Sequence, residues 1–414
     1  MKNINITLAL LMTVIPVESL AGWAESNVII DNSFSNSNVH DNWGGRKLIR
    51  IKDTTHVLVP YGNERIYESN NDGASWAEID NNSSGIRGSL ITAPDNYVYH
   101  FYQYSGDVKM VKYLYDATTI PAPVDIYASS YDSNFGAYTT VNATIDEDGR
   151  LYVFYHYDTG SGGDSIFLLR SVDDGDTWTS PITVKAGTSS TLAYGYMHSD
   201  VTSDGDLILG YSKWGGDELH FAVSSNYGTS WTDTIIDSTE YIYNPAVLPV
   251  GSDTIYYFAQ STDDDGVVFK KSTNSGSTWG SWQVVQGNTG TGYGDPSAAL
   301  GSDGTIYVGF RGSSTTTTLS SQLRPFIAQS TDGGTTWTYP WDNSGGNRSG
   351  SKTVMRYQTW YNYGGYLEWT WLQETSVGSG NYYTYYNIND DISLMDITEG
   401  LKFRGITATG VTIQ

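Results

Sequence analysis

The chain has 414 residues, is rich in glycine, tyrosine and tryptophan, and only 16% of it is charged. Its formal net charge is −23, so nucleic acid and anionic membranes are poor partners on overall electrostatics. It contains no cysteine, which excludes disulfides, a thiolate nucleophile and cysteine-ligated metals.

An apolar run opens the chain. Lys2 precedes the apolar residues 4–17, and Ser19 and Ala21 supply the small side chains that a signal peptidase requires. The run is too short to favour a membrane span. We therefore expect residues 1–21 to be a signal peptide, residues 22–414 to be one mature domain, and the protein to be secreted to the extracellular space or the periplasm.

One short pattern, Ser-x-(Asp/Asn)-x-Gly-x-(Ser/Thr)-Trp, recurs five times. Its polar third residue can hydrogen-bond the turn backbone, its glycine supplies a positive φ, and its tryptophan buries a large apolar surface. The interval between the first two copies is about double the others, which predicts one unit without the motif, and repetition at this period is typical of a propeller or solenoid. The copies are Ser69–Trp76, Ser171–Trp178, Ser224–Trp231, Ser272–Trp279 and Ser330–Trp337.

Seven turn-forming clusters give a second, independent repeat, and each precedes a short run of apolar and aromatic residues that is typical of a half-buried strand. We therefore predict an all-β fold, a seven-bladed β-propeller of four-stranded antiparallel blades. Segments 27–34 and 401–414 also have the pattern of strands and are expected to close the ring against each other. The expected blades span residues 42–79, 86–130, 136–183, 194–237, 241–285, 293–341 and 351–391.

In such blades the beginnings of the first strands and the ends of the second strands lie on one face, opposite the Ser-to-Trp turns. Several of the few cations of this acidic chain fall there, together with tyrosines, which suggests a solvent-filled mouth that binds an anionic ligand and suits sugar rings. The first strands supply Arg46, Arg87, Tyr196, His198, Tyr243, Asn244, Asp295, Arg356 and Tyr357, and the second strands supply Gln103, His156, Lys213, Gln260 and Arg311.

The same residues also have structural explanations. Arg46 and Arg356 can pair with carboxylates at blade junctions, and His156 and His198 can be satisfied buried histidines. The other histidines lack metal-ligand spacing, so we expect no cofactor and no catalytic metal. Acidic runs such as Asp263–Asp265 could hold a structural Ca²⁺ or be solvated turns.

The five Ser-to-Trp turns resemble the Asp-boxes, or BNR repeats, of the sialidase-like β-propeller superfamily, and with the turn clusters the resemblance covers almost the whole mature chain. Asp-boxes also occur in lectins, so they indicate architecture rather than chemistry. Arg46 resembles the first arginine of sialidases, although the sequence that surrounds it in that family is absent. Asp295 and Arg311 resemble the family's glutamate and second arginine, and Tyr357 with Glu374 resembles its tyrosine and glutamate pair.

The chain also resembles the propeller-type polysaccharide lyases, the ulvan lyases among them. These cleave uronic-acid polymers by β-elimination, with a cation on the carboxylate and His or Tyr side chains that move protons. The candidates occur here in the order of that family, with Lys213 in place of an arginine and with His198 able to replace a histidine that segment 138–140 lacks. The resemblance implies the catalytic residues His156, Tyr196, His198, Lys213 and Tyr243, and the substrate-binding residues Arg46, Arg87, Asn244, Asp295, Arg311, Arg356 and Tyr357.

From this resemblance we expect a secreted, monomeric carbohydrate-active enzyme that cleaves an acidic, uronic-acid-containing polysaccharide by β-elimination. Nucleic acid and membranes are not expected as partners. A sialidase-type exo-glycoside hydrolase and a non-catalytic glycan-binding propeller remain the alternatives.

Overall fold

A computed structural model describes the strands of the chain and part of the connections between them. The residues it describes are 28–34, 48–51, 56–58, 65–71, 73–80, 86–93, 96–104, 107–115, 117, 119–128, 141–158, 164–187, 194–213, 218–239, 242–261, 266–286, 294–301, 303–312, 324–342, 353–357, 366–374 and 382–390.

The described residues form seven four-stranded antiparallel sheets, which we number I to VII. Sheet I contains β2 (Leu48–Arg50), β3 (His56–Leu58), β4 (Ile66–Ser69) and β5 (Ala77–Asp80); sheet II contains β6 (Ile86–Thr92), β7 (Tyr97–Tyr104), β8 (Asp107–Leu114) and β9 (Val124–Tyr127). Sheet III contains β10 (Val141–Ile145), β11 (Leu151–Asp158), β12 (Asp164–Ser171) and β13 (Ile182–Lys185); sheet IV contains β14 (Tyr194–Val201), β15 (Leu207–Lys213), β16 (Leu219–Ser224) and β17 (Thr232–Asp237).

The other three sheets follow the same order along the chain, except that the last one takes a strand from the N-terminal part. Sheet V contains β18 (Ile242–Val250), β19 (Thr254–Ser261), β20 (Gly266–Ser272) and β21 (Gln283–Gln286); sheet VI contains β22 (Gly294–Leu300), β23 (Ile306–Gly312), β24 (Arg324–Ser330) and β25 (Thr338–Asp342). Sheet VII contains β26 (Thr353–Tyr357), β27 (Tyr366–Glu374), β28 (Tyr382–Asp390) and β1 (Val28–Phe34).

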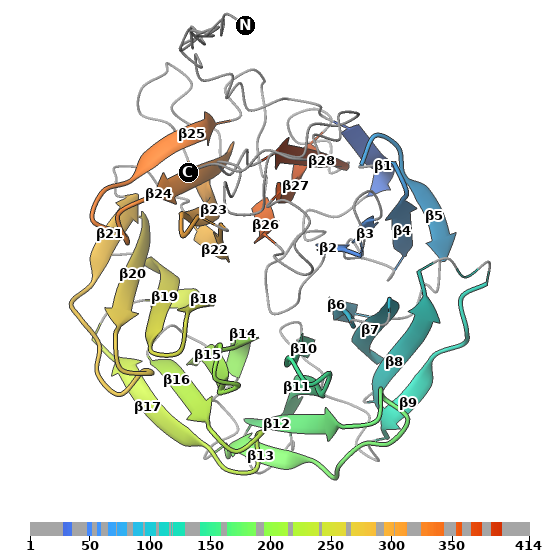
Figure 1. Cartoon of the computed structure of the whole chain (residues 1–414), viewed down its shortest axis with the longest axis horizontal. Helices are drawn as coiled ribbons and strands as arrows, with labels where there is room; N and C mark the ends of the chain where they lie inside the picture. The colour runs from blue at the N-terminus through green and yellow to red at the C-terminus, as the bar shows by residue number, and fades with distance from the viewer. Residues whose placement is uncertain are drawn as a thin grey trace, which may run out of the picture.

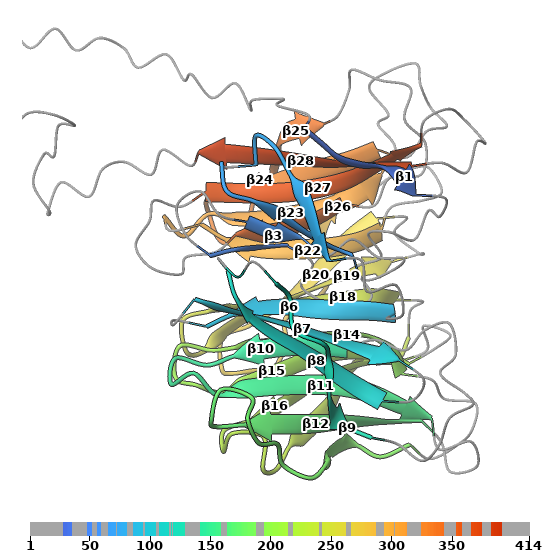
Figure 2. The ribbon, with the colours of Figure 1, turned by 90° about the vertical axis from the view of Figure 1, so that its right-hand side faces the viewer.

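The sheets lie around a common axis, as blades do in a propeller, with the first strand of each sheet innermost (Figure 1). Each innermost strand contacts the innermost strand of the next sheet, and β26 of sheet VII contacts β2 of sheet I. In the side view the inner strands of the sheets run roughly along this axis, so every sheet has one end at each face of the ring (Figure 2). The all-β prediction with four-stranded antiparallel sheets is confirmed.

The N-terminal segment pairs with a strand that the sequence did not indicate. Strand β1 lies at the outer edge of sheet VII and pairs with β28, so the last sheet is completed by the beginning of the chain. Residues 401–414, which were expected to pair with this segment, lie outside the described residues. Their strand character therefore stays a prediction.

The Ser-to-Trp turns join the third and fourth strands of five sheets and have one common structure. In the turn after β20, the Ser272 hydroxyl accepts a hydrogen bond from Gly276 N at 2.9 Å, and Asn274 Oδ1 accepts one from Thr278 N at 2.9 Å. Gly276 has φ +81°, and a Cβ there would lie 2.1 Å from the ring of Phe221 in sheet IV. Trp279 packs edge-on against the same ring. The motif is therefore also a joint between neighbouring sheets.

We call the face that carries these turns the turn face. In sheet V the Ser275 N–H of the Ser-to-Trp turn donates to Asp253 O at 2.8 Å, so the first-to-second-strand turn lies beside it. The opposite face carries the beginnings of the innermost strands and the ends of the second strands, and we call it the loop face. The predicted opposition of the Ser-to-Trp turns and the second-strand ends is therefore confirmed for the described sheets.

A repeated hydrogen bond joins successive innermost strands. The Ser89 hydroxyl accepts from Ala143 N at 3.2 Å, Asn142 Oδ1 accepts from Ser199 N at 3.1 Å, and His198 Nδ1 accepts from Val247 N at 3.4 Å. The three acceptors stand at matching positions of β6, β10 and β14. Each places a polar side chain where the next strand offers a backbone N–H.

Four innermost strands contain a β-bulge near their beginning, at the loop face. In β18, Tyr243 and Ala246 oppose Gln260 and Phe258, so the innermost strand has one extra residue. Such bulges re-aim side chains and are frequent beside active sites. The extra residues lie at Arg87–Gly88 in β6, Gly195 in β14, Asn244–Pro245 in β18 and Asp295–Pro296 in β22.

Candidate functional site

Most of the residues that the sequence singled out lie at the loop face. Strand β15 ends there with Lys213, and His156 lies two residues before the end of β11. Strands β14 and β18 have Tyr196, Tyr243 and Asn244 within their first three residues. His198 is the fifth residue of the eight-residue β14 and lies near its middle, opposite Gly210. Arg87 and Asp295 lie in the bulges of β6 and β22, and Arg311 lies near the end of β23, opposite Gly294. Arg46 falls outside the described residues, as do the side chains of Arg87, Tyr243, Asp295 and Arg311.

The predicted position of Arg356 and Tyr357 at the loop face was wrong. Arg356 and Tyr357 are the last residues of β26, and Tyr357 lies opposite Leu367, the second residue of β27. Their backbone is therefore at the turn-face end of sheet VII, because β26 begins earlier than predicted, at Thr353. Glu374, the expected partner of Tyr357, ends β27 at the other face. The backbone positions of Tyr357 and Glu374 are therefore at opposite ends of sheet VII.

Strand alternation divides the predicted catalytic group between two interfaces. Tyr196 lies opposite Ser212 and His198 lies opposite Gly210, so these side chains share one face of sheet IV. That face meets sheet V, where Gly210 packs against Val247 and Tyr257. Lys213 is offset by one residue from Ser212 and therefore points to the other face of the sheet, toward sheet III.

His156 and Lys213 share the interface between sheets III and IV. Phe154, two residues before His156, packs in one apolar cluster with Leu209 and Tyr211 of sheet IV. Because side chains alternate along a strand, His156 continues the row of Phe154 and Lys213 continues the row of Tyr211. A candidate base and a candidate cation thus lie at the loop-face end of one interface.

His156 is less accessible than the sequence suggested. The prediction placed it in a solvent-filled mouth, whereas its side chain is only 3% exposed. Gln103 of the preceding sheet donates from Nε2 to the His156 carbonyl oxygen at 3.1 Å and is buried as well. Close packing of neighbouring sheets, rather than solvent, surrounds this histidine.

His198 has a defined tautomer. Its Nδ1 accepts a hydrogen bond from the Val247 backbone N–H, so a neutral ring carries its proton on Nε2. The side chain is half-buried and occupies the junction position that Ser89 and Asn142 hold in the two preceding sheets. A structural role for His198 therefore stands beside the catalytic one.

Asn244 sits in the bulge of β18 with a left-handed backbone, at φ 56°. Its Nδ2 donates to Gln260 Oε1 at 3.3 Å, and both side chains are buried. Gly294 of the next sheet packs directly on Gln260, where an added Cβ would lie 1.9 Å from Oε1. A left-handed non-glycine residue costs free energy and is often found at functional sites.

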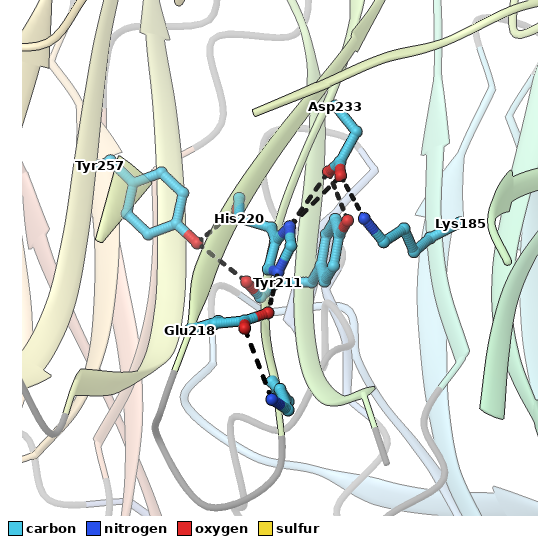
Figure 3. A network of polar contacts seen from close by, with 7 residues as sticks. Lys185, Tyr211, Glu218, His220, Asp233 and Tyr257 are labelled. Carbon is cyan, nitrogen blue, oxygen red and sulfur yellow. Dashed lines mark hydrogen bonds and ion pairs between the residues drawn. The ribbon is translucent and has the colours of Figure 1, made fainter. Parts of the chain in front are cut away.

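A polar network that the sequence did not reveal lies in the interface of His156 and Lys213 (Figure 3). The His220 side chain is 1% exposed and stacks on the Tyr211 ring, with centroids 4.7 Å apart. Its Nδ1 lies 3.3 Å from both Asp233 carboxylate oxygens, and its Nε2 lies 3.2 Å from Glu218 Oε2. The Tyr211 hydroxyl donates to Asp233 Oδ1.

Two lysines end this network. Lys185 of sheet III lies 2.5 Å from Asp233 Oδ2, and Lys213 lies 3.5 Å from Glu218 Oε1. The order of groups is therefore cation, carboxylate, imidazole, carboxylate, cation, and it runs from the end of β15 to the outer part of sheets III and IV. Each carboxylate thus lies beside a lysine, and this pairing offsets part of the cost of burying the two charges.

Both carboxylates of the network are ionised at neutral pH. Burial alone raises the pKa of Asp233, but hydrogen bonds from His220, Lys185 and Tyr211 lower that pKa to about 2. Burial also raises the pKa of Glu218, but the His220 hydrogen bond and the Lys213 charge bring it below its usual value.

Sequence reasoning missed this network because its residues come from several strands of two sheets and follow no motif. His220 had been considered only as a metal ligand. One available signal was the acid two residues after the tryptophan of a Ser-to-Trp turn, which two of the five copies have: Asp233 after Trp231 and Glu78 after Trp76. Within the described part of the chain, no three His, Asp or Glu side chains are grouped as metal ligands would be.

Comparison with known proteins agrees with this architecture. Residues 129–291 match the BNR repeat-like domain. The chain resembles the sialidase-like BNR propellers. This confirms the resemblance given by the five Ser-to-Trp turns. A search of curated proteins finds no significant match. Among the described residues there is no apolar helix of a length that could cross a membrane.

Solved structures with the same fold include enzymes and a peptide-binding protein. An ulvan lyase bound to -[GlcA(1-4)Rha3S]- has a TM-score of 0.57 and 12% identity, over 91% of this chain and 98% of that one. The NanB sialidase from Streptococcus pneumoniae has a TM-score of 0.51 and 10% identity, over 82% of each chain. YCF48 bound to D1 peptide has a TM-score of 0.51 and 13% identity, over 86% and 94%. At these identities the similarity concerns the fold.

Proposed function

We propose that the protein is a secreted polysaccharide lyase that cleaves an acidic, uronic-acid-containing glycan by β-elimination. We also infer that its seven sheets form one closed, seven-bladed domain over residues 22–414. The contacts between successive innermost strands support this closure. The lyase proposal rests on one observation above all, the common interface of His156 and Lys213 at the loop face.

The proposed reaction needs a cation, a base and an acid. The Lys213 ammonium would lie against the uronate carboxylate and stabilise the negative charge that develops when the adjacent C5 loses its proton. Binding of the glycan would have to uncover the buried His156 ring, which would then take that proton. The C4–C5 double bond would form as the C4–O bond breaks, and Tyr196 or Tyr243 would protonate the leaving oxygen. The products are an unsaturated uronate end and a new hydroxyl end.

Substrate binding would involve the bulged strand beginnings. Asn244 with Gln260 offers amide groups for sugar hydroxyls, and Arg87 and Arg311 would contact anionic groups of the polymer. Arg46 stays a predicted substrate contact. No cofactor is required by this chemistry, and a monomer with a glycan partner is what we expect.

A sialidase-type hydrolase is the second candidate. The bulge of β22 holds Asp295 beside the Gly294–Arg311 pair, which keeps the expected acid and arginine in one sheet. The separation of Tyr357 from Glu374 at opposite ends of sheet VII speaks against it. A glycan-binding propeller without catalytic activity is the third candidate.

One experiment separates these functions. The purified protein is incubated with uronate polymers and with sialylated glycans, while the ultraviolet absorbance of unsaturated uronate and the release of free sugar are recorded. For a lyase, Lys213→Ala and Tyr196→Phe should each lower the elimination rate on the order of 10²-fold, and Lys213→Arg should retain more activity than Lys213→Ala. Asp295→Asn should not lower the elimination rate in this way, because proton transfer would not depend on Asp295.

Two outcomes would contradict the proposal. Sugar release without ultraviolet absorbance, abolished by Asp295→Asn, would identify a hydrolase. Glycan binding without any cleavage would identify a binding protein.

A further inference from the structure

Glu218 is in contact with the cation of the proposed reaction. It follows the β15–β16 connection, and its backbone carbonyl accepts from Lys213 N at 3.0 Å, so the two residues are held side by side. Its Oε1 lies 3.5 Å from the Lys213 ammonium, and the two side chains are 30% and 15% exposed. The pair therefore lies at the edge of the buried network.

The second carboxylate oxygen of Glu218, Oε2, is held by the buried network. Glu218 Oε2 contacts His220 Nε2, and the opposite side of that ring is held by Asp233, which is held in turn by Lys185 of the neighbouring sheet. Tyr257 donates from its hydroxyl to the His220 carbonyl oxygen at 2.9 Å and fixes the same segment from sheet V. Glu218 thus has one oxygen committed to the network and one directed to Lys213.

The contact with Glu218 restricts the Lys213 side chain, which by itself is poorly suited to hold a substrate carboxylate in one position. An ammonium on a four-carbon stem is mobile and cannot bind a carboxylate in the two-pronged manner of arginine. We propose that Glu218 is a positioning residue, which holds the Lys213 ammonium at the loop face for the carboxylate of the substrate and is itself oriented by His220. This inference rests on the proposed lyase function.

The proposal has a kinetic signature that a purely structural role would lack. Glu218 is an anion beside the cation that the anionic substrate must approach, so it opposes substrate binding while it orients Lys213. Removing its charge should therefore lower KM and kcat together. A substitution that only loosened the fold would not improve apparent affinity for the substrate.

The test compares wild-type protein with Glu218→Gln, and with Glu78→Gln as the control. Glu78 pairs with Arg65 at 3.4 Å, is similarly exposed at 34%, and belongs to sheet I. On a glucuronic-acid polymer we expect Glu218→Gln to lower kcat about 10-fold and KM about 3-fold, and Glu78→Gln to change neither. Circular dichroism and melting temperature check that both variants fold.

A second measurement does not depend on activity. Each protein is acetylated with an amine-specific reagent at fixed pH, and the labelling rate of Lys213 is followed by peptide mass spectrometry, with Lys109 as the internal reference. Because Glu218→Gln removes the ion pair, Lys213 should label several-fold faster in that variant than in wild type.

The outcomes distinguish this inference from the function on which it rests. Equal Lys213 labelling in both proteins, or equal kcat and KM with an active wild type, would overturn the role of Glu218 and leave the lyase proposal standing. A wild-type protein that forms no unsaturated product overturns the lyase proposal and this role together. Faster labelling with a joint fall in kcat and KM supports it.

Discussion

Replacement of Asp233 by asparagine tests the buried network directly. The carboxylate accepts hydrogen bonds from Tyr211, His220 and Lys185, and these lower its pKa from the usual 3.8 to about 2. Since a tenfold change in proton affinity corresponds to about 1.4 kcal/mol, the ionised carboxylate contributes about 2 kcal/mol at neutral pH. Asp233→Asn should therefore lower the free energy of unfolding by about that amount at pH 7.

The same reasoning fixes the pH dependence. Because the folded-state pKa of Asp233 lies below the unfolded one, the contribution is complete above the usual value of 3.8 and is lost as the pH falls toward about 2. Urea unfolding of wild type and Asp233→Asn at several pH values measures this. The stability difference should shrink between pH 5 and pH 3.

Asp125→Asn is the matched control. Asp125 also pairs with a lysine, Lys109, but its side chain is 45% exposed, so the loss should stay below about 1 kcal/mol. An Asp233→Asn variant no less stable than this control at pH 7, or equally destabilised at pH 7 and pH 3, would refute the reasoning.

Two further predictions concern packing and hydrogen bonding between sheets. Gly276→Ala should destabilise the protein by several kcal/mol more than Gly149→Ala, because both glycines have positive φ but only Gly276 meets a neighbouring ring, that of Phe221; equal melting temperatures would contradict this. His198→Asn should retain an acceptor for the Val247 N–H and cost less stability than His198→Leu, which leaves that N–H without its partner at a cost of about 1–3 kcal/mol. Denaturant unfolding of the two His198 variants would show the reverse order if the junction hydrogen bond were unimportant.

The architecture was predictable because each unit carries local signals. The Ser-to-Trp turn is built from hydrogen bonds within eight residues and a glycine with positive φ, which follows a second positive-φ residue such as Ser275, so it is visible in the sequence without any tertiary information. The pairing of β1 with β28 was not visible, because a strand pattern does not name a partner far away in the chain.

The candidate site was only partly predictable. The sequence places His156 and Lys213 at second-strand ends, but a shift of one residue decides which face of the sheet a side chain occupies, and this separates Lys213 from Tyr196 and His198. The length of β26 was misjudged for a related reason, since turn residues locate a turn but do not say where the strand before it begins. Burial of His156 depends on how closely neighbouring sheets pack, which no local pattern reports.

Each bulge at a strand beginning interrupts the alternation of inward and outward side chains. The two parts of the strand on either side of the bulge therefore alternate independently. From the bulge of β18 toward the turn face, Ala246 and Leu248 keep the inward alternation that packs sheet V against sheet VI. On the other side of Asn244 and Pro245, that alternation no longer dictates which residues face outward. Residues at the mouth can therefore be exchanged, or one more inserted, without disturbing the apolar layers. A family built on this ring can change its ligand while its blades stay the same.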